Sequence, residues 1–97
     1  MRESQIEKHL VNRVKELGGE VRKVKWLGRD GAPDRLVMLP SRETECGTVL
    51  PKTIWVELKA PGKKPEPHQY REHNRMQAMG QRVVVIDSIE GVEELLS

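Results

Sequence analysis

Apolar residues recur along the chain with helical or alternating spacing, and this pattern predicts most of its elements. A stripe with helical spacing predicts an amphipathic helix over residues 4–17, formed by Ile6, Leu10, Val14 and Leu17. The order Ser4-Gln5-Ile6-Glu7 is typical of a capping box, with Ser4 as the N-cap and the side chain of Glu7 reaching back to it. Gly18 and Gly19 would end this helix, because glycine adopts the left-handed conformation at little cost.

The clearest alternation lies at residues 53–60 (TIWVELKA), which we expect to form a strand. Successive side chains of a strand point to opposite faces. The apolar face would carry Ile54, Val56 and Leu58. The other face would carry Trp55, Glu57 and Lys59. A carboxylate and an amine would therefore project together from one face of the sheet.

Four further segments have the character of strands or strand connections. Residues 20–26 (EVRKVKW) are predicted to form a strand, although their alternation is poor, and the short apolar run at 34–39 predicts another strand. The continuous β-branched run at 82–87 is typical of a strand buried on both faces. Residues 40–52 are polar, with proline near both ends, and are expected to form an exposed hairpin connection.

Two more helices complete the pattern. Residues 68–79 are expected to be helical, opened by Pro67 and closed by Gly80. Asp87 or Ser88 can cap a last helix, whose apolar residues are Val92, Leu95 and Leu96.

The order of elements is thus α-β-β-β-α-β-α, which indicates an α/β fold. The strand at 53–60, the helix at 68–79 and the strand at 82–87 would form a right-handed βαβ unit with a parallel pair. The earlier strands are expected to pair antiparallel, giving a mixed sheet flanked by helices. At 97 residues, the chain has room for one domain, spanning 1–97.

Composition narrows the class of protein. No apolar run approaches the ~18 residues of a membrane span, and no signal peptide is visible, so we expect a cytoplasmic protein that is not secreted and contacts no membrane. With Cys46 as the only cysteine, the chain has no internal disulfide and no cysteine zinc site. The net charge of +2 permits nucleic-acid binding but does not argue for it.

Glu57 and Lys59 are the first candidates for chemistry, because two charged groups on a largely apolar sheet need compensation. One alternative is that they form an ion pair, with each other or with nearby charges. The other is that Glu57 binds a cation and Lys59 faces an anionic substrate. Asp34 favours the second alternative, since it starts the preceding strand after Pro33 and can meet Glu57 at one end of the sheet. Two carboxylates with open water positions suit Mg²⁺ or Mn²⁺.

These residues carry a family resemblance. The segments GAPDRL (31–36), WVELKAPG (55–62) and HQ (68–69) resemble the signature of the PD-(D/E)XK nucleases, and more narrowly that of the VRR-NUC family, the virus-type replication-repair nucleases. The similarity extends from the first helix to the strand at 82–87. It implies a restriction-endonuclease-like core and a small stand-alone, metal-dependent DNA endonuclease. Similar small members are thought to act as homodimers on branched DNA, as Holliday junction resolvases do.

The resemblance also implies roles for single residues. It assigns metal binding to Asp34, Glu57 and the backbone carbonyl of Leu58, catalysis to Lys59, and a supporting place in the site to Gln69. Related resolvases often add a glutamate from the first helix, and here the candidate is Glu7. A flap or nicking nuclease with the same site, or a non-catalytic DNA-binding module, remains an alternative.

Each assignment has a plainer explanation. Asp34 could be an ordinary turn residue, Glu7 a capping residue and Gln69 a surface residue. His68 could cap its helix or contact phosphate, and the spacing of the histidines indicates no histidine metal site. Trp26 and Trp55 are expected in the core or in a dimer contact rather than in base stacking.

Basic residues flank the proposed site and could contact DNA phosphates, although a solvated face is the usual reason for such runs. Together with His68, the candidates are Arg22, Lys23, Lys25, Arg29, Lys63, Lys64 and Arg71. A nucleotide cofactor is not expected, because residues 60–64 do not form a Walker A loop and no GxGxxG occurs.

Overall fold

The computed structural model covers residues 1–97 and contains three helices and six strands. The helices are α1 (Glu3–Glu16), α2 (Pro67–Ala78) and α3 (Ile89–Leu96). The strands are β1 (Glu20–Lys23), β2 (Arg35–Leu39), β3 (Arg42–Thr44), β4 (Gly47–Val49), β5 (Lys52–Leu58) and β6 (Val83–Ile86). No helix combines the length and the apolar character that crossing a membrane would require.

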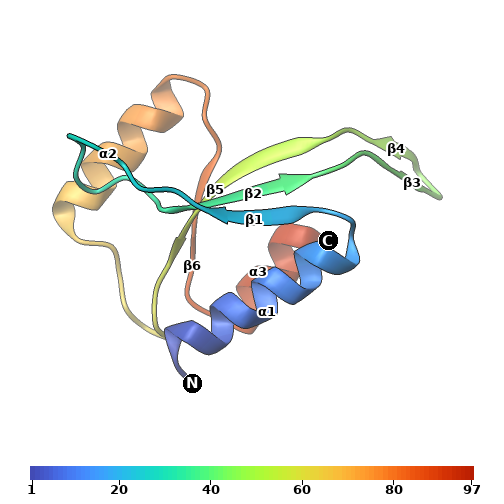
Figure 1. Cartoon of the computed structure of the whole chain (residues 1–97), viewed down its shortest axis with the longest axis horizontal. Helices are drawn as coiled ribbons and strands as arrows, with labels where there is room; N and C mark the ends of the chain where they lie inside the picture. Colours follow the sequence, from blue (N-terminus) through green and yellow to red (C-terminus); the bar gives the residue numbers. More distant parts are fainter.

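Four strands form a mixed sheet in the order β1-β2-β5-β6 (Figure 1). β1 pairs antiparallel with β2, and β2 pairs antiparallel with β5, with Arg35 opposite Val56 and Leu39 opposite Lys52. β5 and β6 are parallel, and α2 connects them. The predicted α/β fold is therefore confirmed, and the predicted order gains only the two short strands of the β3–β4 hairpin.

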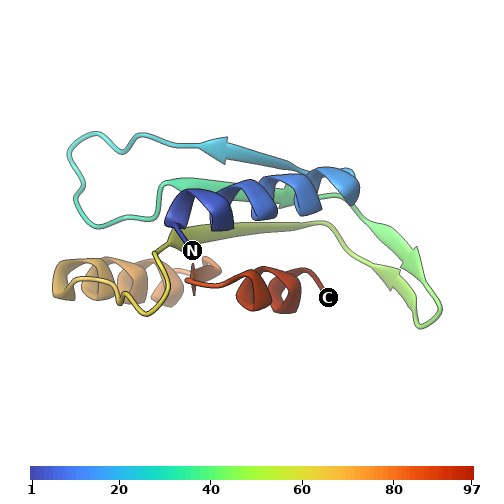
Figure 2. The same ribbon diagram turned by 90° about the horizontal axis from the view of Figure 1, so that it is seen from below.

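Helices cover both faces of this sheet. α1 and α3 lie together on one face, and α2 lies on the opposite face near β6 (Figures 1 and 2). The main core forms between the sheet and the α1–α3 pair, because apolar residues with helical spacing meet the apolar face of β5 there. Its fully buried members are Ile6, Leu10, Val14, Val37, Ile54, Val56 and Val92.

The predicted element ends were correct for α2 and α3 but wrong for the start of α1. Pro67 opens α2, and Ser88 caps α3 by accepting a hydrogen bond from the Gly91 N–H at 2.9 Å. Ser4, in contrast, lies inside α1, which begins one residue earlier. The backbone N–H of Arg2 donates to the Gln5 side chain at 2.6 Å, so Gln5 takes the part that was expected of Glu7.

The strand at the end of the sheet also differs from its prediction. β6 is an edge strand rather than one buried on both faces, and Val85 is 40% exposed on the side that α2 leaves open. A β-branched run does not distinguish these cases, because strands of this composition occur at edges as well as in centres. Residues 40–52 form the expected exposed connection, which carries the β3–β4 hairpin beyond the sheet (Figure 1).

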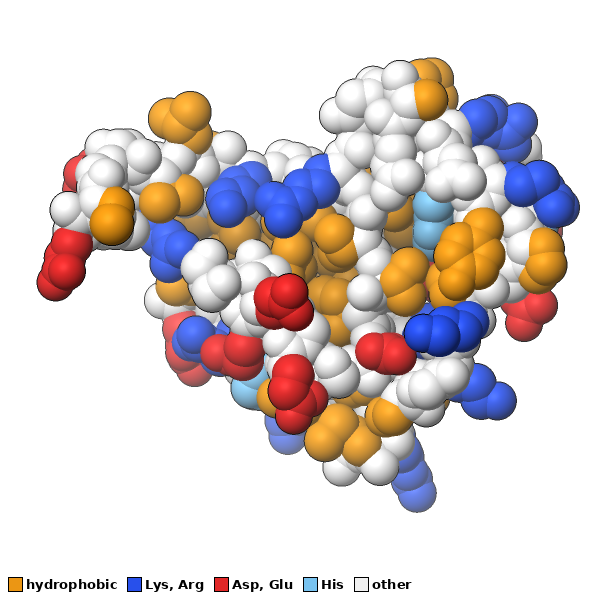
Figure 3. Space-filling model, turned by 180° about the vertical axis from the view of Figure 1, so that it is seen from behind, with side chains coloured by type: hydrophobic (Ala, Val, Ile, Leu, Met, Phe, Trp, Pro, Cys, Tyr) orange, Lys and Arg blue, Asp and Glu red, His pale blue; other side chains and the backbone are white.

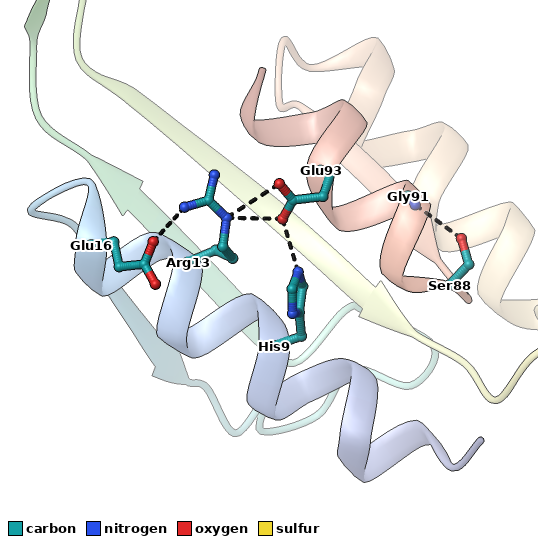
Figure 4. A network of polar contacts seen from close by, with 6 residues as sticks. All are labelled: His9, Arg13, Glu16, Ser88, Gly91 and Glu93. Carbon is teal, nitrogen blue, oxygen red and sulfur yellow. Dashed lines mark hydrogen bonds and ion pairs between the residues drawn. The ribbon is translucent and has the colours of Figure 1, made fainter.

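A polar network joins α1 to α3 on the surface (Figure 4). The Arg13 guanidinium donates to both carboxylate oxygens of Glu93, at 3.2 and 2.9 Å, and His9 Nε2 lies 2.8 Å from Glu93 Oε2. The Arg13 hydrogen bond, followed by His9, lowers the pKa of the Glu93 carboxyl. This network fixes α3 against α1 above the apolar core.

Candidate active site

The site is built around Glu57, near the carboxyl end of β5. Alternation along β5 sends Val56 and Leu58 into the core and turns Glu57 to the opposite face, as predicted. Because α2 covers this part of that face, Glu57 is buried as well, with 8% of its surface exposed. A carboxylate has thus been placed in a largely desolvated position between a sheet and a helix.

Asp34 lies at the start of β2, beside this position. The Val24 N–H donates to the Asp34 carbonyl at 2.9 Å, so the β1–β2 ladder continues to Asp34. Arg35 pairs with Val56, and one further step of the same antiparallel register sets Asp34 opposite Glu57. Residues directly opposite in antiparallel strands have Cβ atoms about 4.5–5.5 Å apart, and their side chains share a face. The two acids expected to meet are therefore neighbours at one end of the sheet.

Lys59 and Gln69 complete a connected group with Glu57. The Lys59 ammonium donates to Gln69 Oε1 at 2.9 Å and lies 3.7 Å from Glu57 Oε2. The Gln69 amide nitrogen faces the same Glu57 oxygen at 3.4 Å. Gln69 Oε1 also accepts the backbone N–H of Glu66 at 2.8 Å, so the amide orientation is fixed at the first turn of α2. Gln69 of α2 is thus brought together with Glu57 and Lys59 at the end of β5.

His73 is a residue of this site that the sequence analysis assigned no role. It lies one helical turn after Gln69 on α2, is 4% exposed, and its Nε2 lies 3.5 Å from Glu57 Oε1. Burial lowers the pKa of His73, and the Lys59 ammonium lowers it further. The signal that could have found it is the i, i+4 spacing from Gln69, since both side chains must then point to the same side of the helix.

The loop that leads to Asp34 is docked on the same helix. Gly31 has a φ of +84°, and a Cβ on it would lie 2.8 Å from the backbone carbonyl oxygen of His68. Arg29 reaches the buried carboxylate of Glu72 at 3.5 Å. α2 therefore contacts the loop before Asp34 through these residues and Glu57 through its other side chains, so one helix sets the positions of both acids.

The two tryptophans, Trp26 and Trp55, hold this loop in place. Their rings pack with centroids 5.1 Å apart, and the Trp26 indole N–H donates to the Pro33 carbonyl at 2.8 Å. Pro33 directly precedes Asp34. The indole hydrogen bond thus holds the chain immediately before the first acid, a positioning role that the spacing of the tryptophans did not indicate.

Glu7 joins the site only indirectly. Its carboxylate forms an ion pair with Arg35, and the other guanidinium nitrogen of Arg35 lies 2.8 Å from Asp34 Oδ1. Arg35 points to the face that α1 covers, whereas Glu57 points to the opposite face. Glu7 therefore contacts the partner of Asp34, and its active-site role stays a prediction.

The candidate DNA contacts lie on the surface around this site. Arg22 pairs with Glu20, and Arg29 pairs with Glu72. His68 is 44% exposed, with Nε2 at 3.8 Å from Asp30. The remaining candidates are all exposed: Lys23, Lys25, Lys63, Lys64 and Arg71. Figure 3 shows Lys and Arg side chains around the end of the molecule that carries α2, and acidic side chains over α3.

The donor set fits a hard divalent cation. Burial raises the pKa of Glu57; Lys59 opposes this shift, and the charge of Asp34 adds to it. A cation between two such carboxylates would relieve both the desolvation and their repulsion. No group of three or more Asp, Glu, His or Cys side chains is placed to hold a metal ion, so the site offers two carboxylates, with the Leu58 carbonyl as the expected backbone ligand. Two carboxylates with the remaining positions left to water and phosphate are the usual set for Mg²⁺.

Comparison with known proteins identifies the family of the chain. No family model matches the chain. A curated protein of Acyrthosiphon pisum secondary endosymbiont phage 1, "Putative nuclease p44", is 50% identical over 88 residues, covering 91% of this chain and 85% of that protein. A solved structure described as "VRR_NUC domain" is 40% identical with a TM-score of 0.79, covering 97% of this chain and 92% of the other. The chain belongs to the VRR-NUC family of nucleases.

Proposed function

We propose that this nuclease is a divalent-metal-dependent DNA endonuclease that acts on branched DNA as a homodimer. The observation that carries the proposal is the convergence of Asp34, Glu57, Lys59 and Gln69 at one end of the sheet. An ordinary ion pair between Glu57 and Lys59 would need neither Asp34 nor the fixed amide of Gln69. Two acids that can hold a cation, with an amine and an oriented amide beside them, can support metal-assisted phosphodiester hydrolysis.

Asp34, Glu57 and the Leu58 carbonyl would hold Mg²⁺ or Mn²⁺. When bound, the cation would polarise the scissile phosphate and lower the pKa of a water molecule. Asp34 is 60% exposed at its side chain while Glu57 is nearly buried, so the pair is open to a substrate on the Asp34 side. A DNA backbone could approach from that side without α2 having to move.

Lys59 would hold the attacking water and offset the negative charge that develops on the phosphate. The hydrogen bond to Gln69 fixes its ammonium beside Glu57. Water adds to phosphorus, the P–O3′ bond breaks, and the departing O3′ takes up a proton. The products are then a 5′-phosphate and a 3′-hydroxyl.

The exposed basic residues around α2 and β1 would contact the phosphates flanking the cut. Backbone contacts of this kind position DNA without reading its sequence. One chain carries one such site, and opposed cuts in a four-way junction need two sites related by a two-fold axis. A symmetric dimer supplies them through a single interface.

The test is cleavage of end-labelled four-way junction, flap and linear duplex DNA with Mg²⁺ or Mn²⁺. We expect symmetric cuts in the junction that disappear on chelation and in Glu57→Ala. Lys59→Met should reduce kcat about 10²–10³-fold, which is the typical effect of removing one group that stabilises transition-state charge. The matched control is Lys8→Met, on the exposed surface of α1, which should cleave as the wild type does.

Other outcomes select the alternatives. Cuts in flap DNA or nicks in duplex DNA that also depend on Glu57 would support the nuclease activity but contradict the proposed specificity for junctions. If the protein binds DNA without cleaving it, and Glu57→Ala binds equally well, the chain is a non-catalytic DNA-binding module.

A further inference from the structure

His73 contains the one buried side-chain nitrogen or oxygen in the protein that has no hydrogen-bond partner. This atom, Nε2, has essentially no accessible surface. Buried polar atoms without partners are rare in folded proteins and call for a specific explanation. The acceptor it faces is Glu57 Oε1, at 3.5 Å, slightly beyond the usual N–H···O distance of about 2.7–3.2 Å.

The two oxygens of Glu57 consequently have different neighbours. Oε2 faces the Lys59 ammonium at 3.7 Å and the Gln69 amide at 3.4 Å. Oε1 faces His73. The terminal torsion of a glutamate is broad, so a carboxylate held at one oxygen alone can still rotate about its last bond. A donor at the second oxygen removes that freedom.

We propose that His73 is a positioning residue that donates its Nε2 proton to Glu57 Oε1 and thereby fixes the plane of the carboxylate, with Oε2 turned towards Lys59. This inference rests on the proposed metal site, of which Glu57 is one ligand. An N–H at Nε2 is present in one neutral tautomer of imidazole and in its protonated form, so the role does not depend on the charge of His73. Groups that orient a ligating side chain in this way change metal affinity without touching the metal.

A matched pair of substitutions separates donation from packing. His73→Gln places an amide N–H near the position of Nε2, whereas His73→Met fills a similar length with no donor. Both variants, the wild type and Glu57→Ala are titrated with MnCl₂ by calorimetry in the absence of DNA, after thermal unfolding has shown that each is folded. Asn74→Met, at an exposed position of the same helix, is the control for substitution in α2.

We expect His73→Met to weaken Mn²⁺ binding about 10–100-fold, as loss of an orienting partner does, and His73→Gln to restore most of the affinity. In cleavage assays, His73→Met should need more Mn²⁺ but recover most of the wild-type kcat at saturation. If His73→Met does not fold, His73→Asn, whose amide is too short to reach Oε1, takes its place.

Three outcomes contradict the proposal. If His73→Met binds Mn²⁺ as tightly as the wild type does, His73 has no positioning role. If the Met and Gln variants lose the same amount of Mn²⁺ affinity, the effect of His73 is packing alone. In either case, binding that still disappears in Glu57→Ala would leave the proposed function standing. If the wild type binds no Mn²⁺, or if Glu57→Ala binds it normally, the metal site and this inference both fail.

Discussion

Glu57 shows how a single residue can serve a site at the expense of the fold. Its carboxylate lies between α2 and the sheet, where burial raises its pKa despite the nearby Lys59 ammonium. An acid whose pKa is higher in the folded than in the unfolded state destabilises the fold once it ionises. The folded state is therefore less stable once Glu57 ionises, and the proposed metal site would need that ionised form.

Replacing Glu57 with glutamine, its uncharged isostere, should remove this loss of stability. We expect Glu57→Gln to melt a few degrees higher than the wild type at pH 7.5 and to lose cleavage. The gain in melting temperature should shrink as pH falls through the folded-state pKa of Glu57, and vanish below the unfolded-state pKa, where the wild-type carboxyl is protonated in both states. Thermal unfolding across this pH range, with Glu90→Gln as an exposed control, measures the effect. A lower melting temperature at neutral pH would show that the ion pair with Lys59 outweighs burial.

At the scale of elements, α2 is the part that assembles the site. It supplies Gln69 and His73 to Glu57, and its first turn receives the loop that precedes Asp34. The close approach of that loop depends on Gly31, which combines a left-handed backbone with contact against the His68 backbone. A side chain at this position would separate the loop from the helix.

Two glycines of the same loop allow a controlled test of this contact. Gly28→Ala introduces a side chain at a φ of +70° with no atom within 4 Å, so it should cost about 1–2 kcal/mol of stability for the backbone alone. Gly31→Ala should cost more and should also reduce cleavage, because Asp34 would shift away from Glu57. Chemical unfolding and cleavage rates measure the two effects. Equal losses of stability with intact cleavage would mean that the loop does not set the position of Asp34.

The link between α1 and α3 should respond to acid. The Arg13 hydrogen bond and His9 hold the pKa of Glu93 below its usual value, so Glu93 stabilises the folded state when ionised. Glu93→Gln should therefore melt slightly below the wild type at pH 7, and the difference should be lost as pH falls through the folded-state pKa of Glu93. Melting curves at several pH values in low salt would detect it. A difference that persists in strong acid would point to packing instead of charge.

Much of this arrangement could be predicted from local sequence, and the failures have physical causes. The alternation at 53–60 separates the core residues from Glu57, because successive side chains of a strand point to opposite faces. The N-cap of α1 was misplaced because two capping patterns overlap two residues apart: Ser4 with Glu7, which was predicted, and Arg2 with Gln5, which forms. The contacts of His73 with Glu57 and of Trp26 with Pro33 and Trp55 could not be predicted, because they depend on how α2 and the loop before Asp34 pack on the sheet rather than on local sequence.

At the scale of the whole molecule, the proposed function predicts a dimer. The proposed junction cleavage needs two sites, and each chain has one. Light scattering after size-exclusion chromatography should give twice the 11.1 kDa mass of the chain. A strictly monomeric protein that still cuts four-way junctions symmetrically would contradict the two-fold arrangement.

The β3–β4 hairpin has a consequence for engineering the chain. It leaves the sheet between Leu39 and Lys52, which face each other in the antiparallel register of β2 and β5. Two strands in that register can be joined by a two-residue turn such as Asn-Gly. The intervening segment is therefore removable in principle without disturbing the pairing that brings the two acids together. A shortened chain of this kind would show whether the β3–β4 hairpin contacts DNA, a second subunit, or neither.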